Sequence, residues 1–557
     1  MCEIFRLNFA EINPQKLDNL YSININSIND LPQAIIAIKE LFNISSTLIK
    51  ENRELKEVNQ TLRDEIALLK GEKGKPKILP NTKPKNLDIS STAHTGKKKK
   101  WKKGSKKDII KIDKTVICSV DKEHLPPDVQ FKGYDRRVSQ NIVFKRENIE
   151  YLLELYYSPS ENKTYHGELP KDSGYFSNDL KALSVLMHNF LDVSRNKLLR
   201  LYESMGVEMS PGSLNNILQD KAQMWIDEKN ELLRAGLSGA VAQTDITGAR
   251  VRGKNHYTHI ICGEYFTVYN TLAGKSRRDV LMAFAGELPE GLFYQYNSHT
   301  LRLLEHFKVS ADDKQALSEL FKLEQIVSES EFIATIEKSI PALHKKTKIF
   351  KRVCDSFALA YFYEHSPLKI LVSDDAPEYE LIAMIRMLCW IHDARHYKKL
   401  IPVFDHHRDI LNTFLDNYWK YYDRLLDYKC NPQPETAQKI NDEFDLLFSP
   451  DTDYADLNKQ IERTKANKDK LLTVLDYPFL PLHNNSSELK ARVQVRKRDI
   501  ALHTMTALGT KLQDAFMSII QTCLQLDVDV WQYLLNRFNN NATTYLPAIV
   551  RMKYNTS

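Results

Sequence analysis

The sequence predicts a multidomain α+β protein, and three features of the chain support that prediction. A length of 557 residues, of which 42% are hydrophobic and 27% charged, is enough for more than one buried core. Segments that alternate like β-strands are followed by segments with the period of helices. A stretch rich in lysine, glycine and proline separates an N-terminal heptad pattern from the rest of the chain. We therefore expect an N-terminal coiled-coil helix, a flexible linker and mixed domains behind it.

The N-terminal segment, residues 31–70, has the pattern of a leucine zipper. Leucines recur every seven residues from Leu41 to Leu69, and asparagines occupy two of the alternate core positions. Asparagines that pair across a coiled-coil core lower its stability but favour a parallel dimer in one register. The alternative is a single amphipathic helix that packs on its own chain. The residues expected to form the dimer interface are Leu41, Leu48, Asn52, Leu55, Asn59, Leu62 and Leu69.

Residues 71–110 show no hydrophobic period and are expected to form a basic flexible linker. Lysines crowd into the run GKKKKWKKGSKK, which cannot neutralise its own charge. This density of positive charge favours a polyanion as partner, nucleic acid first of all, although a solvated linker can have the same composition. The candidate DNA-binding lysines are Lys97, Lys98, Lys99, Lys100, Lys102, Lys103, Lys106 and Lys107.

Two smaller units are predicted between the linker and residue 238. Residues 111–172 alternate in strand fashion and indicate a small β-rich unit with its turn in the sequence SPSENK. Residues 177–236 have a helical period and are interpreted as three helices. Gly206 is expected to end the second helix, and Ser210 and Pro211 to begin the third. Helices joined in this way form either a helix-turn-helix-like domain, which enters a major groove, or a plain packing unit.

Acidic residues mark the segment where chemistry is expected. Asp245 lies inside the first of three short apolar strands, where an unpaired buried carboxylate would be costly. Asp374 and Asp375 follow the apolar run LKILVS, at the carboxyl end of a predicted strand, where open α/β sheets bind ligands. Glu488 lies in the first turn of a later helix. Carboxylates at such positions supply the oxygen ligands that Mg²⁺ requires.

The helix that contains Glu488 also has a simpler interpretation. Asn485 and Glu488 have the spacing of a capping box, which needs no catalysis to explain it. Arg492 and Arg496 follow Glu488 on one face of the helix, at intervals of four residues. Spacing alone does not distinguish a helix cap from a catalytic acid with cations beside it.

Four segments of the chain resemble the large transposase of the insertion-sequence-66 type. In order, they are QTDITGARVRGKNHYTHI, SDDAPEY, MLCWIHDARHYKKL and PLHNNSSELKARVQVRKR. The zipper, the basic linker and the helix-turn-helix are similar to that family's layout, so the resemblance covers nearly the whole chain. It implies a ribonuclease-H-like α/β catalytic core over 238–505. The intervals between Asp245, Asp374 and Glu488 are long, so we expect insertions in this core, and the helical pattern near 288–365 and 404–475 marks them. A helical tail is expected over 506–557. The residues that match the family's signature are Cys389, Trp390, His392, Arg395, Asn484 and Asn485.

The resemblance also implies a chemistry. Asp245, Asp374 and Glu488 would be the catalytic, metal-binding acids of a DDE transposase, with Asp375 the neighbouring choice for the second acid. Two Mg²⁺ or Mn²⁺ ions are the implied cofactors for DNA strand cleavage and strand transfer. The residues expected to position DNA phosphates are Arg492, Arg496 and Lys497.

Partners and location follow from the same interpretation. We expect double-stranded DNA (the terminal repeats of the element and its target), a homodimer through the zipper, and accessory proteins of the same element. No apolar run approaches the roughly 18 residues that cross a bilayer, so we expect a cytoplasmic, nucleoid-associated protein without a membrane partner. Family members often have a zinc module of four cysteines within the region of 111–172, where only Cys118 remains here. No zinc is therefore expected.

Two other functions stay open at this point. The chain can be a catalytically inactive, DNA-binding relic of a transposase. Alternatively, His392 and His396 can bind zinc from one helix face, as in H-E-x-x-H hydrolases, with Asp393 as the general base. The candidates for a third zinc ligand are Asp405, His406 and His407.

Overall fold

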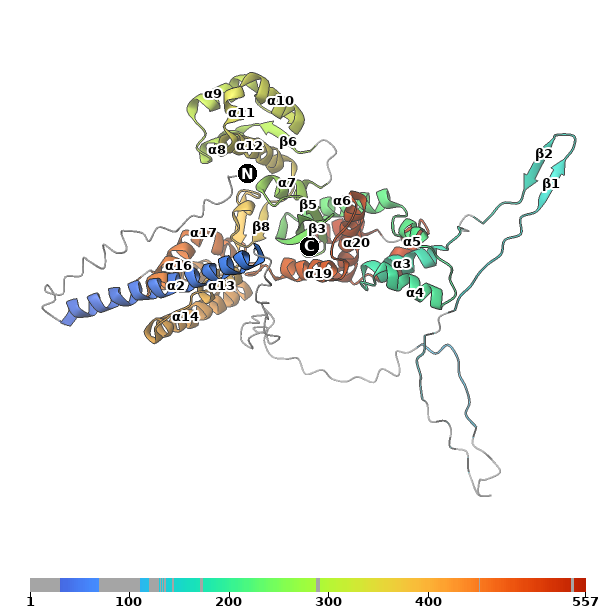
Figure 1. Ribbon diagram of the computed structural model, residues 1–557, viewed down its shortest axis with the longest axis horizontal. Coiled ribbons are helices and arrows are strands. Elements are labelled where there is room, and N and C mark those ends of the chain that lie inside the picture. Colours follow the sequence, from blue (N-terminus) through green and yellow to red (C-terminus); the bar gives the residue numbers. More distant parts are fainter. Residues whose placement is uncertain are drawn as a thin grey trace. The chain divides into compact units, whose positions relative to one another are not determined.

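The computed structural model shows a mixed α+β protein with a central sheet and many helices (Figure 1). It describes residues 31–69, 111–119, 130, 132, 134, 137–142, 145–170, 174–286, 291–449, 451–541 and 545–556. The predicted α+β class is confirmed. None of the helices in these ranges is both long enough and apolar enough to span a membrane. The chain divides into two compact units, the first comprising Met1–Lys83, Asp172–Leu198 and Pro211–Ser557, the second Pro84–Lys171 and Leu199–Ser210.

The second unit contains a β-hairpin. Strands β1 (Leu155–Ser158) and β2 (Lys163–His166) pair antiparallel, with Ser158 opposite Lys163. The turn therefore lies within SPSENK, as the sequence predicts. The side chains of both strands are exposed except for a half-buried Ser158, so the hairpin has no core of its own.

A five-stranded mixed sheet organises the first unit, in the order β5–β4–β3–β8–β9. Strands β3 (Val241–Val251), β4 (Lys254–Cys262) and β5 (Thr267–Leu272) are antiparallel neighbours. Strands β8 (Ile370–Ser373) and β9 (Ile385–Leu388) run parallel to β3. All but one of the side chains of β8 and β9 are buried, as is usual for parallel strands covered on both faces.

Helix α19 (Asn485–Ala501) packs across β3 and β4, and helix α20 (Ala507–Gln525) packs on β5. Three α20 residues at intervals of four accept hydrogen bonds from backbone amides of β5, and together they close this edge of the sheet. The pairs are Thr271 N to Asp514 Oδ2 at 2.7 Å, Tyr269 N to Ser518 Oγ at 2.9 Å and Thr267 N to Thr522 Oγ1 at 3.1 Å.

The described part of the C-terminal segment 506–557, for which the sequence predicts a helical tail, packs on the sheet and on an earlier helix. After α20 it continues through α21 (Val530–Phe538) and α22 (Leu546–Thr556), and α22 packs on the earlier helix α6 (Ala222–Leu237). Buried Glu228 of α6 pairs with Arg537 of α21 at 2.8 Å. The end of the chain thus completes the domain that contains the sheet.

The helical unit 177–236 has four helices, where three were predicted. Ser177 caps the first, Gly206 follows the second with φ +74° and Pro211 begins the next, as expected. The long third helix of the prediction is wrong, because the chain breaks it at Lys221, which has a positive φ of 55°. The helices are α3 (Asn178–Asn189), α4 (Arg195–Ser204), α5 (Pro211–Leu218) and α6.

Two long segments interrupt the sheet, as the spacing of the acids suggested. The first insertion is the segment 273–369 between β5 and β8. It contains α7 (Arg277–Ala285), α8 (Ser298–His306), α9 (Ala311–Leu320), α10 (Glu329–Ser339), α11 (Pro341–Lys345) and α12 (Thr347–His365). It also contains an antiparallel pair that the sequence did not indicate, β6 (Phe293–Tyr296) and β7 (Gln325–Ser328).

The second insertion is the segment 399–484, between helix α13 (Trp390–Lys398) and α19. It is helical throughout its regular structure, as predicted. Its helices are α14 (Asp405–Cys430), α15 (Pro434–Leu447), α16 (Ala455–Ala466), α17 (Lys468–Leu471) and α18 (Thr473–Asp476).

Helix α2 (Leu31–Leu69) is a single long helix, and one face of it packs on the second insertion. Asn43 donates to the carbonyl of Asp453 at 3.1 Å and accepts from the amide of Ala455 at 3.0 Å. Lys50 forms an ion pair with Asp456 at the start of α16. This face of α2 therefore packs on its own chain, which is the alternative to a zipper that the sequence left open.

The zipper leucines lie on another face of α2. Leu41, Leu48 and Leu55 are 41%, 46% and 56% exposed, and Asn52 and Asn59 are exposed as well. Leu41 and Leu48 precede Asn43 and Lys50 of the packed face by two positions, roughly 200° around a helix, and Leu55 lies one heptad after Leu48. Among the zipper residues whose side chains the structure describes, Leu62 is half-buried and the others are exposed.

Candidate active site

Asp245 lies in the middle of β3, at the level where the neighbouring strand β8 ends. Gln243 of β3 pairs with Val372 of β8 in parallel register. Continuing that register by two residues places Asp245 beside Asp374, the residue that follows β8. Two acids that are distant in the sequence therefore come together because their strands are neighbours.

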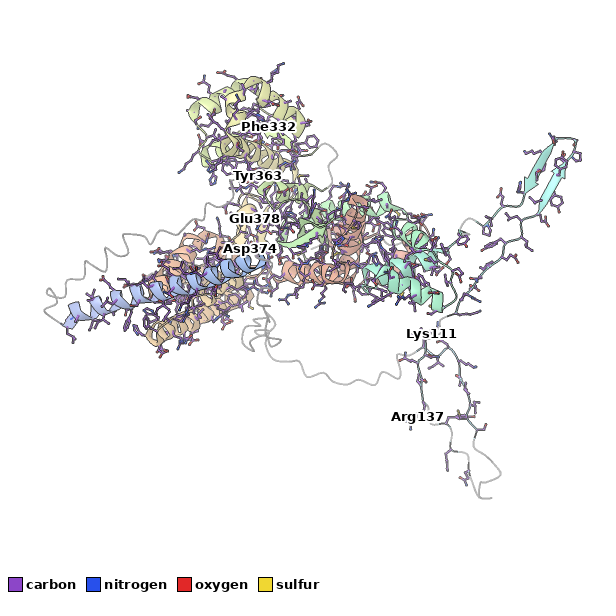
Figure 2. The ribbon with its side chains drawn as sticks, viewed as in Figure 1. Lys111, Arg137, Phe332, Tyr363, Asp374 and Glu378 are labelled. Carbon is purple, nitrogen blue, oxygen red and sulfur yellow. The ribbon has the colours of Figure 1, made fainter. Side chains whose placement is uncertain are left out.

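The structure distinguishes Asp374 from Asp375. Asp374 begins the turn after β8 (Figure 2), where its Oδ1 accepts the amide of Ala376 at 3.1 Å. Asp375 faces the second insertion instead, forming an ion pair with Arg463 and lying 3.2 Å from His396 Nε2. The hydrogen bond from His396 holds the pKa of Asp375 well below its usual range, and the charge of Arg463 adds to this. The carboxylate of Asp375 is thus paired with Arg463 and His396, which favours Asp374 as the candidate for the second acid.

Glu488 lies in the first turn of α19 and faces helix α13. Its Oε2 accepts a hydrogen bond from Arg395 at 3.0 Å, and its Oε1 lies 3.4 Å from Nε2 of His392. Arg395 also donates to His392 Nε2 at 3.0 Å, so His392 acts as an acceptor there. Burial, and then the charge of Arg395, lowers the pKa of His392, which keeps its ring neutral. Glu488 Oε1 is buried and makes no hydrogen bond.

The charge on Asp245 is sensitive to both other acids. Burial raises the pKa of Asp245 to about 7, opposed by a hydrogen bond from the amide of Ile246. The negative charges of Asp374 and Glu488 raise it further, whereas Arg395 lowers it. The interaction between two charges weakens with distance. The effects of Asp374 and Glu488 on the pKa of Asp245 therefore indicate that the three carboxylates lie near one another.

The start of α19 is attached directly to the strand that contains Asp245. Asn484 donates its side-chain amide to the carbonyl of Thr244 at 2.7 Å, and Ser487 donates to the same oxygen at 3.3 Å. Asn484, not Asn485, is the N-cap, and no side chain caps this helix. The capping-box interpretation of Asn485 and Glu488 is therefore wrong. These contacts bring Glu488 to the end of the sheet.

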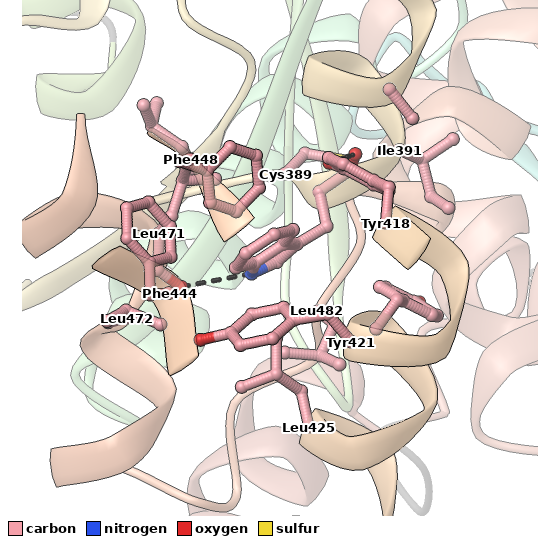
Figure 3. Close-up of a cluster of buried hydrophobic side chains, with 14 of the residues drawn as sticks. Cys389, Ile391, Tyr418, Tyr421, Leu425, Phe444, Phe448, Leu471, Leu472 and Leu482 are labelled. Carbon is pink, nitrogen blue, oxygen red and sulfur yellow. Dashed lines mark hydrogen bonds between the residues drawn. The ribbon is translucent and has the colours of Figure 1, made fainter. Parts of the chain in front are cut away.

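Two signature residues, Cys389 and Trp390, are structural. Trp390 is fully buried among aromatic side chains of the second insertion, and its Nε1 donates to the Leu471 carbonyl at 3.0 Å (Figure 3). The Sγ of Cys389 accepts the amide of Asn484 at 3.2 Å, and burial raises the pKa of Cys389 to about 11. This pair fixes α13, with His392 and Arg395, against the sheet and the start of α19.

The three acids have the chemistry of Mg²⁺ ligands, but their side chains are not arranged as a complete metal site. Within the described ranges no group of three or more His, Cys, Asp or Glu side chains is arranged to hold a metal ion. The donors nevertheless fit: all are carboxylates, Glu488 Oε1 is a buried acceptor without a hydrogen bond, and the like charges around Asp245 would be relieved by a cation.

The candidate DNA contacts on α19 separate into two groups. Arg492 and Arg496 are exposed, as a phosphate-binding role requires. Lys497 is only 4% exposed, pairs with Asp192 at 3.2 Å and donates to the carbonyl of His188. The prediction of a DNA contact is wrong for Lys497, because its charge is used to attach α19 to α3. The lysines Lys97, Lys98, Lys99, Lys100, Lys102, Lys103, Lys106 and Lys107 lie outside the described residues.

The residues of the zinc-hydrolase alternative have other partners. Asp393, the supposed base, is buried and accepts hydrogen bonds from Thr464 at 2.8 Å and Tyr418 at 3.0 Å. Burial raises the pKa of Asp393 to about 6. The suggested third ligands lie at the start of α14: Asp405 pairs with Arg408, His406 lies 3.7 Å from Asp453 and His407 stacks on Tyr454.

Sequence reasoning missed Arg386 of β9, which organises the turn that contains Asp374. Arg386 is 8% exposed, and its guanidinium donates to the carbonyl of Asp374 at 2.7 Å and to that of Ala376 at 2.9 Å. It also donates to Ser373 Oγ at 3.0 Å and pairs with Glu380 at 2.6 Å. The signal was present, because an arginine inside the apolar strand IRML needs buried partners just as Asp245 does.

Comparisons with known proteins give one relative and no function. No family model matches the chain. A protein of Sinorhizobium fredii (strain NBRC 101917 / NGR234), described as uncharacterized protein y4jO, is 30% identical over 332 residues. That similarity covers 58% of this chain and 100% of the relative.

Proposed function

The chain belongs to the same family as the y4jO protein, and we propose that it is a DNA transposase of the insertion-sequence-66 type. Its reactions would be metal-dependent DNA strand cleavage and strand transfer at the ends of the element. One observation supports this most directly: the parallel register of β3 and β8 puts Asp374 beside Asp245, and the start of the helix that contains Glu488 is hydrogen-bonded to Thr244, the residue before Asp245.

The sheet supports a ribonuclease-H-like core for this enzyme. Asp245 is on the central strand of the order β5–β4–β3–β8–β9, and Asp374 directly follows the strand parallel to it. Glu488 arrives on a helix whose first residues are bonded to β3. The insertions enlarge this core without separating the three acids.

The roles of the residues follow from their surroundings. Asp245, Asp374 and Glu488 would hold two Mg²⁺ or Mn²⁺ ions, which when bound activate an attacking oxygen and stabilise a leaving one. Asp245 has to release its proton to become a ligand, and its raised pKa makes that release part of binding. Arg492 and Arg496, exposed on the helix of Glu488, would hold DNA phosphates by charge-assisted hydrogen bonds.

The proposed reaction has two balanced steps. Water first attacks a phosphodiester at the element end, forming one P–O bond while the bond from phosphorus to the 3′ oxygen breaks. This leaves a 5′ phosphate and a 3′ hydroxyl, and the 3′ oxygen takes up a proton that the water releases. That hydroxyl then attacks a phosphodiester of the target, forming one P–O bond while another breaks. Neither step needs a covalent bond to the protein.

The partners in this proposal are double-stranded DNA and a second copy of the chain. The lysine-rich linker would add sequence-independent affinity by releasing counterions from the phosphates. The leucine stripe of α2 would join the two copies, so that both ends of an element can be handled in one complex.

The test uses the full chain, labelled duplexes that contain the DNA flanking its own gene, and MgCl₂. We expect strand cleavage that leaves 3′ hydroxyl ends and disappears in chelator. Asp245→Asn, Asp374→Asn and Glu488→Gln should each abolish cleavage and keep DNA binding. Glu443→Gln is the control, because Glu443 pairs with Arg424 within the second insertion and not with the acids.

Two results would contradict the proposal. Cleavage that survives in all three acid variants would show that these residues are not the catalytic set. Binding without any cleavage by the native chain would favour an inactive relic of a transposase.

A further inference from the structure

The turn between β8 and β9 contains the second acid and is held in an uncommon conformation. It runs from Asp374 through a short 3₁₀ helix (Pro377–Tyr379) to Leu381. Leu381 has φ +66°, in the left-handed region that branched and bulky residues rarely occupy. Such a conformation persists only when surrounding contacts stabilise it.

The first insertion supplies contacts at the strained end of the turn. Tyr363 of α12 donates its hydroxyl to the carbonyl of Leu381 at 2.5 Å. Arg277 of α7 donates to the carbonyl of Glu380 at 2.9 Å and is itself fixed by Asp355 of α12 at 2.8 Å. Figure 2 shows Tyr363 between the helices of this insertion and the labelled turn residues Glu378 and Asp374.

Two basic side chains of the second insertion form ion pairs with acidic residues of the turn. Arg463 of α16 pairs with Asp375, the residue directly after the second acid. Lys470 of α17 binds both carboxylate oxygens of Glu380, at 2.9 and 3.0 Å. The two insertions, which leave the sheet at different points, therefore meet at one short turn.

We propose that the two insertions act as a clamp that fixes the position of Asp374, with Tyr363 and Arg463 as positioning residues. This inference rests on the proposed function, since it assigns the insertions a role in that same site. The clamp explains why two long segments interrupt the sheet: each supplies side chains that the turn cannot obtain from the sheet alone. Neither residue needs to touch DNA or metal for this role.

The experiment compares two variants with matched controls in the full chain. Tyr363→Phe removes one hydroxyl, and Arg463→Ala removes one ion pair. Tyr428→Phe is the first control, because its hydroxyl also donates to a carbonyl, that of Leu475 at 2.8 Å, within the second insertion. Arg424→Ala is the second, because Arg424 pairs with Glu443 at 3.0 Å away from the turn.

Two readouts other than DNA cleavage test the clamp. Amide hydrogen exchange of the metal-free chain should speed up about fivefold over 375–382 in both variants, the size expected for one lost hydrogen bond. The affinity for Mn²⁺ alone should weaken by a similar factor. A titration that follows the electron paramagnetic resonance signal of free Mn²⁺ measures this affinity. Both controls should match the native chain in exchange and in affinity.

The outcomes separate this inference from the proposed function. If the native chain binds Mn²⁺ and cleaves DNA while Tyr363→Phe and Arg463→Ala equal it in both readouts, the clamp is overturned and the function stands. Faster exchange with unchanged Mn²⁺ affinity also overturns the clamp, because the turn then moves without moving Asp374. A native chain that neither binds Mn²⁺ nor cleaves DNA overturns both.

The arginine variant has a further check. If Arg463 acts only through Asp375, the double variant Arg463→Ala with Asp375→Asn should lose no more Mn²⁺ affinity than either single variant. Additive losses would contradict action through this pair.

Discussion

Asp245 shows how a single residue can be unfavourable for folding and suitable for binding a cation. Its carboxylate is largely removed from water and lies near two other acids, so its charge is disfavoured until a cation arrives. Arg386 shows the opposite case, a buried charge for which every donor shown has an oxygen partner. The two residues belong to one sheet, but the hydrogen bond from the Ile246 amide and the charge of Arg395 do not offset the burial of Asp245.

At this scale we predict a pH-dependent effect of Asp245→Asn in metal-free protein. An unfolded chain releases the Asp245 proton near pH 4, whereas the folded chain holds it to about pH 7. The native chain therefore loses stability as pH rises through this window, and asparagine does not. The melting temperature of the variant should equal that of the native chain near pH 4 and exceed it by at least about 2 °C at pH 8.

Thermal melts in EDTA at several pH values measure this difference. Asp416→Asn, at an exposed position of α14, controls for removing a carboxylate in general. A difference that does not vary with pH would contradict the raised pKa of Asp245.

Helices and strands show how side chains at regular intervals replace missing backbone partners. Strand β5 is at the edge of the sheet, and its outward amides would be buried without partners beneath α20. Asp514, Ser518 and Thr522 are spaced so that one helix face supplies an acceptor to every second residue of the strand. Helix α20 thus supplies the hydrogen-bond acceptors that a sixth strand would otherwise supply to the backbone amides of β5.

We predict that Thr522→Val destabilises the chain without changing its shape. Valine has the size of threonine but leaves the backbone amide and carbonyl of Thr267 without their buried partner. The cost should be about 1–3 kcal/mol, measured as a lower urea midpoint. Thr413→Val is the control, because the Thr413 hydroxyl bonds only to the exposed carbonyl of Asp409 in its own helix. Equal midpoints for the two variants would refute this account.

For the whole molecule, α2 has two faces with different partners. One face is fastened to the second insertion, near Asp453 and Asp456, and α16, which begins beside these contacts, also contains Arg463. On another face, Leu41, Leu48 and Leu55 are exposed within the part of the helix that the structure describes. A dimer formed through this stripe would be attached to the same insertion that contacts the proposed site.

We predict that Leu48→Glu combined with Leu55→Glu converts a dimer into a monomer. Glutamates in a coiled-coil core would bury like charges opposite one another, which outweighs the gain from the remaining leucines. Light scattering of the protein as it elutes from a size-exclusion column measures the mass of the oligomer. Leu446→Glu, at an exposed position of α15, should leave the dimer intact. A native chain that is already monomeric would remove the zipper from the proposal.

The sequence by itself determined the α+β class, the hairpin turn and the helical character of the long insertions, because these depend on local periodicity and turn chemistry. It did not determine that Asp375 turns to Arg463, that Lys497 is buried, or that Asn484 ties α19 to β3. Nor did it show that helix α20 closes the sheet edge. Only the tertiary structure decided these points, since each depends on which distant segment supplies the partner of a buried polar group.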